Sequence, residues 1–422
     1  MPDSLKTKCA YIFDNGIFCS FAERLSRDFG KVLYAPSCFG QTPSMNRGKI
    51  GTGLEGIEVV EFGERMDEAD IFCFPDVGYG HFQQDLVDQG KAVWGARMGE
   101  ELELFRVDTK KHLKSLGIPI GPYEVVHGMS ALRVYLKEHK NVHVKIDKYR
   151  GSFESFRSKD YKSSEPKLDE VAAKLGPFGL ITDFICEDDL PDRVEVGIDC
   201  PTMVNGQFPQ RLMAGIEIKD AGYVGVVKPY SSFPKAVTDV DKALADTFKS
   251  YGYAGPYSSE VRVGKDGVGY PVDLTCRLPS PPNEAYQENC ANISQLVWGG
   301  AHGELVEPEW THKYAAELII TSDMAWADKH FQPIDFDKKY RNNIKIRNHI
   351  IIEGQDYCVP QRVGFPEVGA VVGLGDTLEA AIEQVKEIAD TVSGYYLKIP
   401  LEVFDQAQDE IDKLKAIGID MF

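Results

Sequence analysis

The stretch YSSEVRVGKDGVGYPVDLTCR, residues 257–277, has the pattern of a β-hairpin with an acid on each strand. Two strand-like runs, Tyr257–Val263 and Gly269–Leu274, flank a polar connection that begins and ends with glycine. Glu260 and Asp273 lie 13 positions apart, so antiparallel pairing brings their carboxylates side by side. Magnesium is usually held by one or two carboxylates plus substrate phosphates, so the pair predicts a nucleotide site. Two solvated acids on a hairpin are the alternative.

Basic side chains upstream of the hairpin offer the complementary half of such a site. Lys145 ends an apolar strand pattern, Lys148 and Arg150 follow it beside Gly151, and Lys219 occurs later, within IEIKD. A lysine on a half-buried strand needs a counter-charge, which phosphate oxygens supply, and a short loop carrying Lys, Arg, Gly and Ser could close over a triphosphate. The alternative for each lysine is a surface side chain whose ammonium group reaches solvent.

Length, charge and cysteine usage limit the classes of protein. The chain has 422 residues, which is more than twice the ~150 residues of a typical domain, so we expect two or three domains. With 47 basic and 65 acidic residues its net charge is −18, which opposes direct binding to a nucleic-acid backbone. The nine cysteines form no Cys-x-x-Cys pair, and no apolar run is long enough for a signal-peptide core or a membrane span. We therefore expect a reduced, cytoplasmic enzyme without a nucleic-acid or membrane partner.

Alternating strand-like and helix-like patterns predict an α/β protein, with a parallel sheet in the first hundred residues. The helical pattern Gly99–Leu116, ended by a glycine and a proline, marks the start of a second domain. We expect domains at residues 1–98, 99–310 and 311–422. The expected strands are Cys9–Phe13, Lys31–Ala35, Glu58–Phe62, Ala69–Phe74, Ala92–Gly95, 123–126, 142–146, 180–185, 194–199, a strand-rich block at 211–227, Lys313–Thr321, His349–Glu353 and Gly369–Gly373. The expected helices are Phe21–Phe29, His81–Gln89, 130–139, 167–175, 239–251, 284–298 and Thr377–Thr391, the last with Asp376 as N-cap.

The order of the charged features resembles that of ATP-grasp enzymes. In that family a strand lysine (here Lys145) is followed by a loop, an acidic segment (Asp183 to Glu187), a strand acid (Glu195), a second lysine (Lys219) and an acidic hairpin. The resemblance implies an α/β ATP-grasp fold with an N-terminal Rossmann-like domain. It also implies a central ATP-grasp domain, whose two subdomains clamp ATP, and a small C-terminal α/β domain.

Individual segments are similar to the purine-biosynthetic branch of the family, in particular to glycinamide ribonucleotide synthetase. Residues 106–110, RVDTK, resemble the start of its ATP-binding domain, and Val144-Lys145 resembles its first phosphate-binding lysine. Residues 273–277, DLTCR, resemble the metal motif Glu-x-Asn-x-Arg, and residues 371–381 resemble the strand, turn and helix near the end of that enzyme. The similarity extends from about residue 99 to residue 400.

The resemblance implies an ATP-dependent ligase that uses Mg²⁺ or Mn²⁺. Such enzymes form an acyl phosphate from a carboxylate and ATP, and an amine then displaces phosphate to form a C–N bond. An arginine at position 277 suits contact with the acyl phosphate because its planar fork can hold two oxygens at once. The implied metal ligands are Glu260, Asp273 and Thr275, and the implied ATP contacts are Arg106, Lys110, Lys145, Lys148, Asp183, Glu187, Glu195 and Lys219. The implied catalytic residues are Arg277 and Lys219, and Asn15, Asp76 and Arg277 are candidate substrate contacts.

Three departures from the family pattern bear on the substrate. Thr275 occurs where an Asn ligand is expected and Asp273 where a Glu is expected, so one of two metals could be held differently. The loop Lys148–Phe156 contains a single glycine, Gly151. The glycine-rich N-terminal turn that holds a ribosylamine phosphate is absent, which argues against phosphoribosylamine as the substrate.

Other functions remain open at this point. A phosphotransferase could use the same clamp without an amine, and a nucleotide-binding regulatory protein could retain the fold without turnover. A dinucleotide-dependent oxidoreductase is disfavoured because no Gly-x-Gly-x-x-Gly opens a helix in the N-terminal half. For the ligase, the partners are a small-molecule carboxylate and an amine, and the protein could be a monomer or a homodimer.

Overall fold

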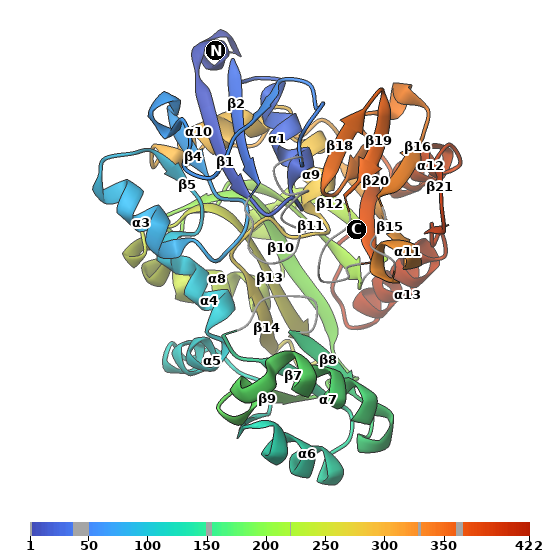
Figure 1. The fold of residues 1–422 in the computed structure, drawn as a ribbon. Coiled ribbons are helices and arrows are strands. Elements are labelled where there is room, and N and C mark those ends of the chain that lie inside the picture. The colour runs from blue at the N-terminus through green and yellow to red at the C-terminus, as the bar shows by residue number, and fades with distance from the viewer. Residues whose placement is uncertain (1, 37–49, 149–153, 220, 328–330, 360–365) are drawn as a thin grey trace.

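The computed structural model describes residues 2–36, 50–148, 154–219, 221–327, 331–359 and 366–422. Figure 1 shows the N-terminal strands at the top, a small lobe at the bottom and the C-terminal segments at the right, all arranged around a central sheet. The fold is α/β, as the sequence predicts.

The N-terminal region is a five-stranded parallel sheet with the strand order β3-β2-β1-β4-β5. Its core strands are buried along their length, except for the first residue of the strand that begins at Lys31, so they read as continuous runs rather than alternating ones. The predicted parallel sheet is confirmed, although β3, β4 and β5 are shorter than the apolar runs suggested. The elements are β1 (Cys9–Asp14), α1 (Cys19–Ser26), β2 (Lys31–Pro36), β3 (Ile57–Val59), β4 (Ile71–Cys73), α3 (Gly80–Asp88) and β5 (Val93–Trp94).

The helix predicted at Gly99–Leu116 is wrong as a single element. The structure has a 3₁₀ turn at Arg97–Glu100, then α4 (Glu101–Leu104) and α5 (Arg106–Ser115). The chain leaves helical geometry at Phe105, and the Asp147 side chain accepts a hydrogen bond from the backbone N–H of Val107 at 3.0 Å. A carboxylate from a distant segment therefore caps the second helix, which no local pattern could reveal.

The small lobe is a four-stranded antiparallel sheet, ordered β6-β9-β7-β8, with two helices over one face. Its helix α7 begins earlier than predicted because Asp160 caps it, accepting from the Ser163 N–H. Strand β9 begins later than predicted because a 3₁₀ turn occupies Gly176–Leu180. The elements are β6 (Tyr123–His127), α6 (Met129–Glu138), β7 (Val142–Ile146), β8 (Ser155–Ser158), α7 (Tyr161–Leu175) and β9 (Asp183–Asp188).

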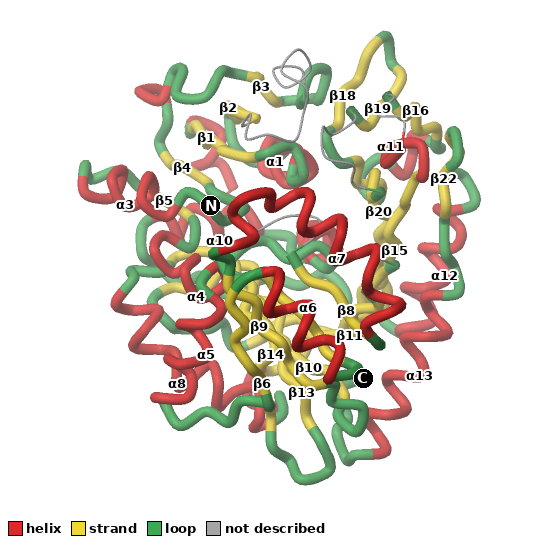
Figure 2. The backbone as a smooth tube through the Cα atoms, turned by 60° about the horizontal axis from the view of Figure 1, so that its bottom comes forward, coloured by secondary structure: helices red, strands yellow, loops and turns green. Residues whose placement is uncertain are grey.

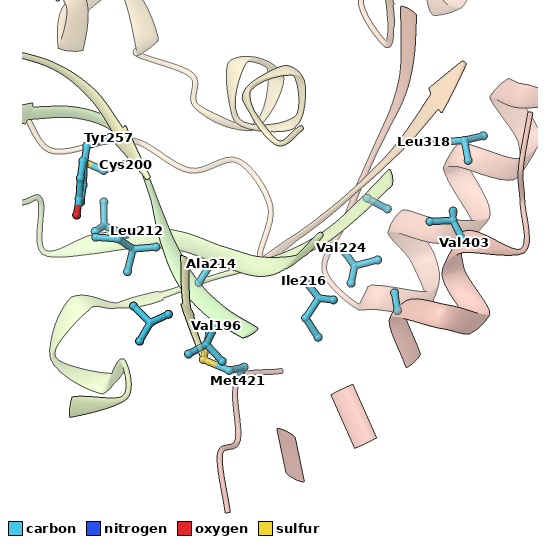
Figure 3. Close-up of a cluster of buried hydrophobic side chains, with 14 of the residues drawn as sticks. Val196, Cys200, Leu212, Ala214, Ile216, Val224, Tyr257, Leu318, Val403 and Met421 are labelled. Atoms are coloured by element: carbon cyan, nitrogen blue, oxygen red, sulfur yellow. The ribbon is translucent and has the colours of Figure 1, made fainter. Parts of the chain in front are cut away.

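A nine-stranded sheet forms the centre of the molecule, in the order β14-β13-β10-β11-β12-β15-β20-β17 with β22 beside β15. One face is apolar and is covered by α8 and α13. Figure 3 shows Val196, Ala214, Ile216 and Val224 on this face, with Met421 from the C-terminus among them. In Figure 2, strands β10, β13 and β14 lie at the centre of the view, with α8 on the left and α13 on the right. The elements are β10 (Val194–Val204), β11 (Arg211–Ile218), β12 (Gly222–Pro229), α8 (Lys235–Ser250), β13 (Ala254–Val263), β14 (Gly269–Thr275), β15 (Tyr314–Ser322), β17 (Ile344–Ile346), β20 (Glu367–Gly375), β22 (Leu397–Lys398) and α13 (Val403–Ala416).

The C-terminal third of the chain shares the central sheet. Strand β15 pairs with β12 and β20, so the sheet crosses the boundary expected at residue 310. Helix α12 (Leu378–Ala389) is capped by Thr377, which accepts from the Ala380 N–H, and Asp376 is therefore not the N-cap. A second, four-stranded sheet consists of β18 (His349–Ile352), β19 (Gln355–Cys358), β16 (Gln332–Asp335) and β21 (Ser393–Gly394), and α11 (Asp323–Ala327) precedes it.

The helix predicted at residues 284–298 is two helices, α9 (Asn283–Asn289) and α10 (Ile293–Ala301). The break occurs because Asn292 bonds to the segment before β15 instead of continuing the first helix. Its Nδ2 donates to the Glu307 carbonyl at 2.9 Å, and its Oδ1 accepts from the Glu309 N–H at 2.8 Å.

Candidate active site

The hairpin of β13 and β14 brings the predicted pair of acids together, although its register shifts between Glu260 and Val261. Glu260 lies directly opposite Asp273, and Gly197 of β10 lies opposite Glu260 on the other side. A Cβ at Gly197 would lie 1.7 Å from the Ser259 carbonyl oxygen, so the strands approach closely where Glu260 projects. This face of the sheet is the one opposite to the apolar face, because side chains alternate along each strand.

Further acids surround this pair. Glu195 lies two residues before Gly197 on β10 and forms an ion pair of 2.8 Å with Arg262 of β13. Burial, together with Glu195, Asp273 and Glu217, raises the pKa of Glu260 well above its usual range. Glu195, Asp273 and Glu217 concentrate negative charge around Glu260, and such a concentration of carboxylates favours a bound cation.

The small lobe reaches this face through Lys145 of β7. Its Nζ donates to the Val272 carbonyl at 2.5 Å and lies 3.6 Å from Asp273 and 3.4 Å from Glu187 of β9. Although burial opposes it, the charges of Asp273, Glu187 and Glu260 raise the pKa of Lys145. Lys145 therefore remains an ammonium group held between the two sheets.

Glu187 is paired with two lysines. It forms an ion pair with Lys110 of α5 as well as the contact with Lys145. Burial alone would raise the pKa of Glu187, but the two ammonium groups outweigh it and lower the pKa. We call Lys110, Lys145, Glu187, Glu260 and Asp273 the Lys145 cluster; it joins α5, the small lobe and the central sheet.

Two other predicted ATP contacts lie next to the Lys145 cluster. Arg106 begins α5, donates to the Ile146 carbonyl at 2.9 Å and lies 3.7 Å from Glu154. Lys148 follows β7, with its ammonium group 5.2 Å from the centre of the Phe105 ring. The next part of the loop expected to close over a triphosphate, residues 149–153, lies outside the described residues.

The structure does not bring every predicted ATP contact into this cluster. Asp183 lies at the far end of β9 from Glu187 and pairs with His127 at 2.7 Å. Lys219 is an exposed residue in the turn after β11. Thr275 lies opposite Ser258, two residues after Asp273 on the same strand and on the same face. The described residues contain no group of three or more His, Cys, Asp or Glu side chains that could hold a metal ion.

A second group of predicted residues meets beyond the end of β14. Arg277 Nε donates to Glu103 of α4 at 3.0 Å and lies 3.9 Å from Asp76 Oδ1. Asp76 Oδ2 accepts from the Asn15 side-chain amide at 3.0 Å. Asn15 and Asp76 follow β1 and β4, so the three candidate substrate contacts meet at the carboxyl edge of the parallel sheet, where open α/β sheets bind ligands. We call Asn15, Asp76, Glu103 and Arg277 the Asp76 cluster.

Sequence reasoning missed two parts of this region. Glu103 is 3% exposed and also accepts from the Cys276 N–H at 2.8 Å, but only a helical charge pattern marked it in the sequence. Asp199 accepts from Tyr223 Oη at 2.7 Å and from Ser258 Oγ at 2.8 Å. The period of two from Glu195 along β10 would have placed Asp199 on the same face.

Solved structures share this fold. A phosphoribosylamine–glycine ligase from Thermotoga maritima has 18% sequence identity and a TM-score of 0.68, over 93% of this chain and 98% of that chain. A biotin carboxylase from Campylobacter jejuni, in a β,γ-ATP complex, has 14% identity and a TM-score of 0.65, over 98% of each chain. The biotin carboxylase domain of a Hydrogenobacter thermophilus 2-oxoglutarate carboxylase, a dimer with MgADP, ADP and bicarbonate, has 11% identity and a TM-score of 0.66, over 97% of this chain and 98% of that chain.

No family model and no curated protein sequence matches the chain. At identities this low the likeness establishes the fold alone. The chain has the ATP-grasp fold of these structures, as the resemblance in the sequence implied. No helix of the described residues is long and apolar enough to cross a membrane.

Proposed function

We propose that the chain is an ATP-dependent ligase that joins a carboxylate to an amine or to ammonia through an acyl phosphate. The Lys145 cluster is the observation that carries this proposal. It places two lysines and a pair of facing carboxylates between the two sheets, which is the charge arrangement that a metal-bound triphosphate needs. Solved structures of the same fold are complexes with ADP, with MgADP or with β,γ-ATP.

The residues fit a magnesium ion together with substrate phosphates. Glu260 and Asp273 would supply two oxygen ligands, and the neighbouring acids Glu195 and Glu217 add negative charge beside them. When bound, the metal would neutralise phosphate charge. Thr275 is a weaker ligand than the Asn of the family motif, so we place the main metal contacts on the two carboxylates.

The chain's own residues have separate roles in this proposal. Lys110 and Lys145 would exchange part of their pairing with Glu187 for phosphate oxygens, and Arg106 would support the same edge. The substrate carboxylate oxygen attacks the γ-phosphorus and the bond to ADP breaks. The amine nitrogen then attacks the acyl carbon, and the C–O bond to phosphate breaks with phosphate as the leaving group. Arg277, at the end of the hairpin, would contact the acyl phosphate oxygens once it loosens from Glu103.

Three predicted ATP contacts, Glu195, Lys219 and Asp183, lie outside the Lys145 cluster. We place Glu195 and Lys219 at the margin of the ATP site and leave Asp183 as the weakest candidate, because it pairs with His127. The eight described cysteines are unpaired and buried, which supports a reduced setting such as the cytoplasm. The partners would be a small carboxylate and an amine.

An ADP-release assay over pairs of carboxylates and amines, with and without magnesium, tests the proposal. We expect release only when both substrates and the metal are present. We expect Glu260→Gln and Asp273→Asn to lower turnover by about 100-fold or more while the circular-dichroism spectrum stays unchanged, because each removes ligand charge. Glu383→Gln, at an exposed position on α12, is the matched control.

Other outcomes would select other functions. Full activity in both hairpin variants would contradict the metal assignment. A phosphorylated product that persists without an amine would identify a phosphotransferase, and nucleotide binding without turnover on any substrate pair would favour the regulatory alternative.

A further inference from the structure

Three successive backbone N–H groups after β4 are occupied by a carboxylate of the chain itself. The N–H groups of Gly78, Tyr79 and Gly80 donate to Glu100 at 2.7, 3.1 and 2.9 Å. They lie at the start of α3, on the carboxyl edge of the parallel sheet. Backbone N–H groups arranged in this way commonly bind a substrate phosphate. Here the Glu100 carboxylate accepts all three hydrogen bonds instead.

The charges around this place are also negative. Asp14, Asp76, Glu100 and Glu103 are each at most 8% exposed. Arg277 pairs with Glu103 and approaches Asp76, whereas Asp14 accepts from Tyr34 Oη and the backbone. After the larger effect of burial, the charge of Asp76 contributes to raising the pKa of both Asp14 and Glu100. A phosphate held by the N–H groups at the start of α3 would meet this field unfavourably.

An unsatisfied oxygen atom lies at the adjoining turn. Asn348 is 1% exposed, and its Oδ1 has no hydrogen-bond partner among the described residues. It packs against Gly16, the residue after Asn15, where a Cβ would lie 2.1 Å from that oxygen. The Asn348 backbone N–H holds the same turn by donating to the Gly16 carbonyl at 2.7 Å. A buried acceptor without a donor is costly, so this atom points to a ligand that brings an N–H group.

We propose that the amine substrate is an unphosphorylated amine that binds as an ammonium ion, with Asp76 and the Asn348 amide oxygen accepting its N–H donors. An ammonium group offers three donors and no acceptor, which matches a site made of carboxylate and amide oxygens. The Asp76 carboxylate would also take the proton that the ammonium loses, which frees the nitrogen lone pair for attack on the acyl carbon. This inference rests on the proposed ligase function, although amine binding is measurable without turnover.

Binding of matched amines tests it. Glucosamine is compared with glucosamine 6-phosphate, and ethanolamine with phosphoethanolamine, by thermal shift and calorimetry on the full chain with MgADP present. We expect at least one unphosphorylated amine to bind about tenfold or more tightly than its phosphate ester. Asp76→Asn should lower amine affinity about tenfold or more, and Asn348→Ala should lower it less, because Asp76 carries the charge.

The variants need controls for folding and for the nucleotide site. Asp246→Asn, at an exposed position on α8, is the matched control and should leave amine binding unchanged. Stabilisation by MgATP is measured for every variant, since it reports on the nucleotide site rather than on the amine site. Asp76→Asn should keep this response while it loses amine binding.

Three results would overturn the inference. These are tighter binding of the phosphorylated amines, unchanged amine affinity in Asp76→Asn, or no response of the wild type to any amine while MgATP still stabilises it. Absence of stabilisation of the wild type by MgATP would instead contradict the proposed ligase function. A failure of the amine-site inference can therefore be distinguished from a failure of the proposed function.

Discussion

Asp199 is a buried acid on the face of the central sheet that carries the candidate active site. Its burial predicts that the free energy of unfolding depends on pH. It is 6% exposed, and burial raises its pKa to about 6 even though hydrogen bonds from Tyr223 and Ser258 oppose the shift. The folded protein therefore binds this proton more tightly than the unfolded chain does. Burying the ionised carboxylate costs free energy of folding. This cost is absent below pH 3.8, the unperturbed pKa of an aspartate, and is fully present above about pH 6.

Asp199→Asn should remove this cost, because an amide does not titrate. The variant should gain free energy of unfolding relative to the wild type as the pH rises from 4 to 7, by up to about 3 kcal/mol, and the gain should then stay constant. Urea unfolding at a series of pH values measures the difference. The exposed Asp246→Asn should give no such rise, and a difference for Asp199→Asn that is flat from pH 4 to 7 would show that burial does not shift this acid.

The residues that could be predicted from sequence are those whose neighbours are fixed by local pairing. Glu260 and Asp273 face each other on one hairpin, with a register shift between Glu260 and Val261 that the sequence did not reveal. Lys145 could be placed because its strand alternates. The partner of Arg277 was not predictable in this way. Its partner is Glu103, which is 174 residues away along the chain, and no periodicity connects such positions.

At the scale of elements, the backbone N–H groups at the start of α3 are hydrogen-bond donors. One side chain, Glu100, determines whether an anion can bind to them. Glu100→Ala would leave the N–H groups of Gly78, Tyr79 and Gly80 without their acceptor. We expect a loss of about 1–3 kcal/mol in the free energy of unfolding, because buried donors become unpaired. We also expect the variant to gain stabilisation by millimolar inorganic phosphate, which the wild type should lack.

Thermal shift with phosphate, and with chloride at equal ionic strength, measures this gain. Glu100→Gln is the control, since its amide oxygen can still accept from the same backbone groups. A phosphate response in the wild type equal to that of Glu100→Ala would mean that Glu100 does not close the site.

Most elements were predictable, and their ends were not. The parallel N-terminal sheet and the hairpin follow from apolar periodicity, which reflects burial on one or both faces. The breaks at Phe105 and at residues 290–292 depend on distant capping groups, Asp147 and the segment around Glu307. A helical pattern records which face is buried, but it does not record where another part of the chain supplies a hydrogen bond.

At the scale of the whole molecule, the hydrophobic cores divide the chain differently from its predicted boundaries. One core joins the N-terminal sheet to the central sheet and includes Trp94, Met213, Leu278 and Val372. Trp94 also donates to Thr202 of the central sheet at 2.9 Å. The small lobe has a separate core, which is formed within the lobe itself. The N-terminal and central sheets should therefore unfold together, whereas the small lobe can open by itself.

Hydrogen exchange should resolve this division. Without nucleotide, amides of β7 and β9 should exchange through openings of lower free energy than amides of β1, β10 and β12, because the lobe's core is smaller and independent. MgATP should slow exchange in the lobe about tenfold or more, since a ligand held by both sheets stabilises only the closed arrangement.

Lys145→Met should lose most of that protection by MgATP, because Lys145 makes the contact across to Val272 and Asp273. Lys386→Met, at an exposed position on α12, should retain it. Equal opening free energies in the two cores, or full protection by MgATP in Lys145→Met, would mean that the lobe and the central sheet behave as one rigid unit and that Lys145 does not couple them through the nucleotide.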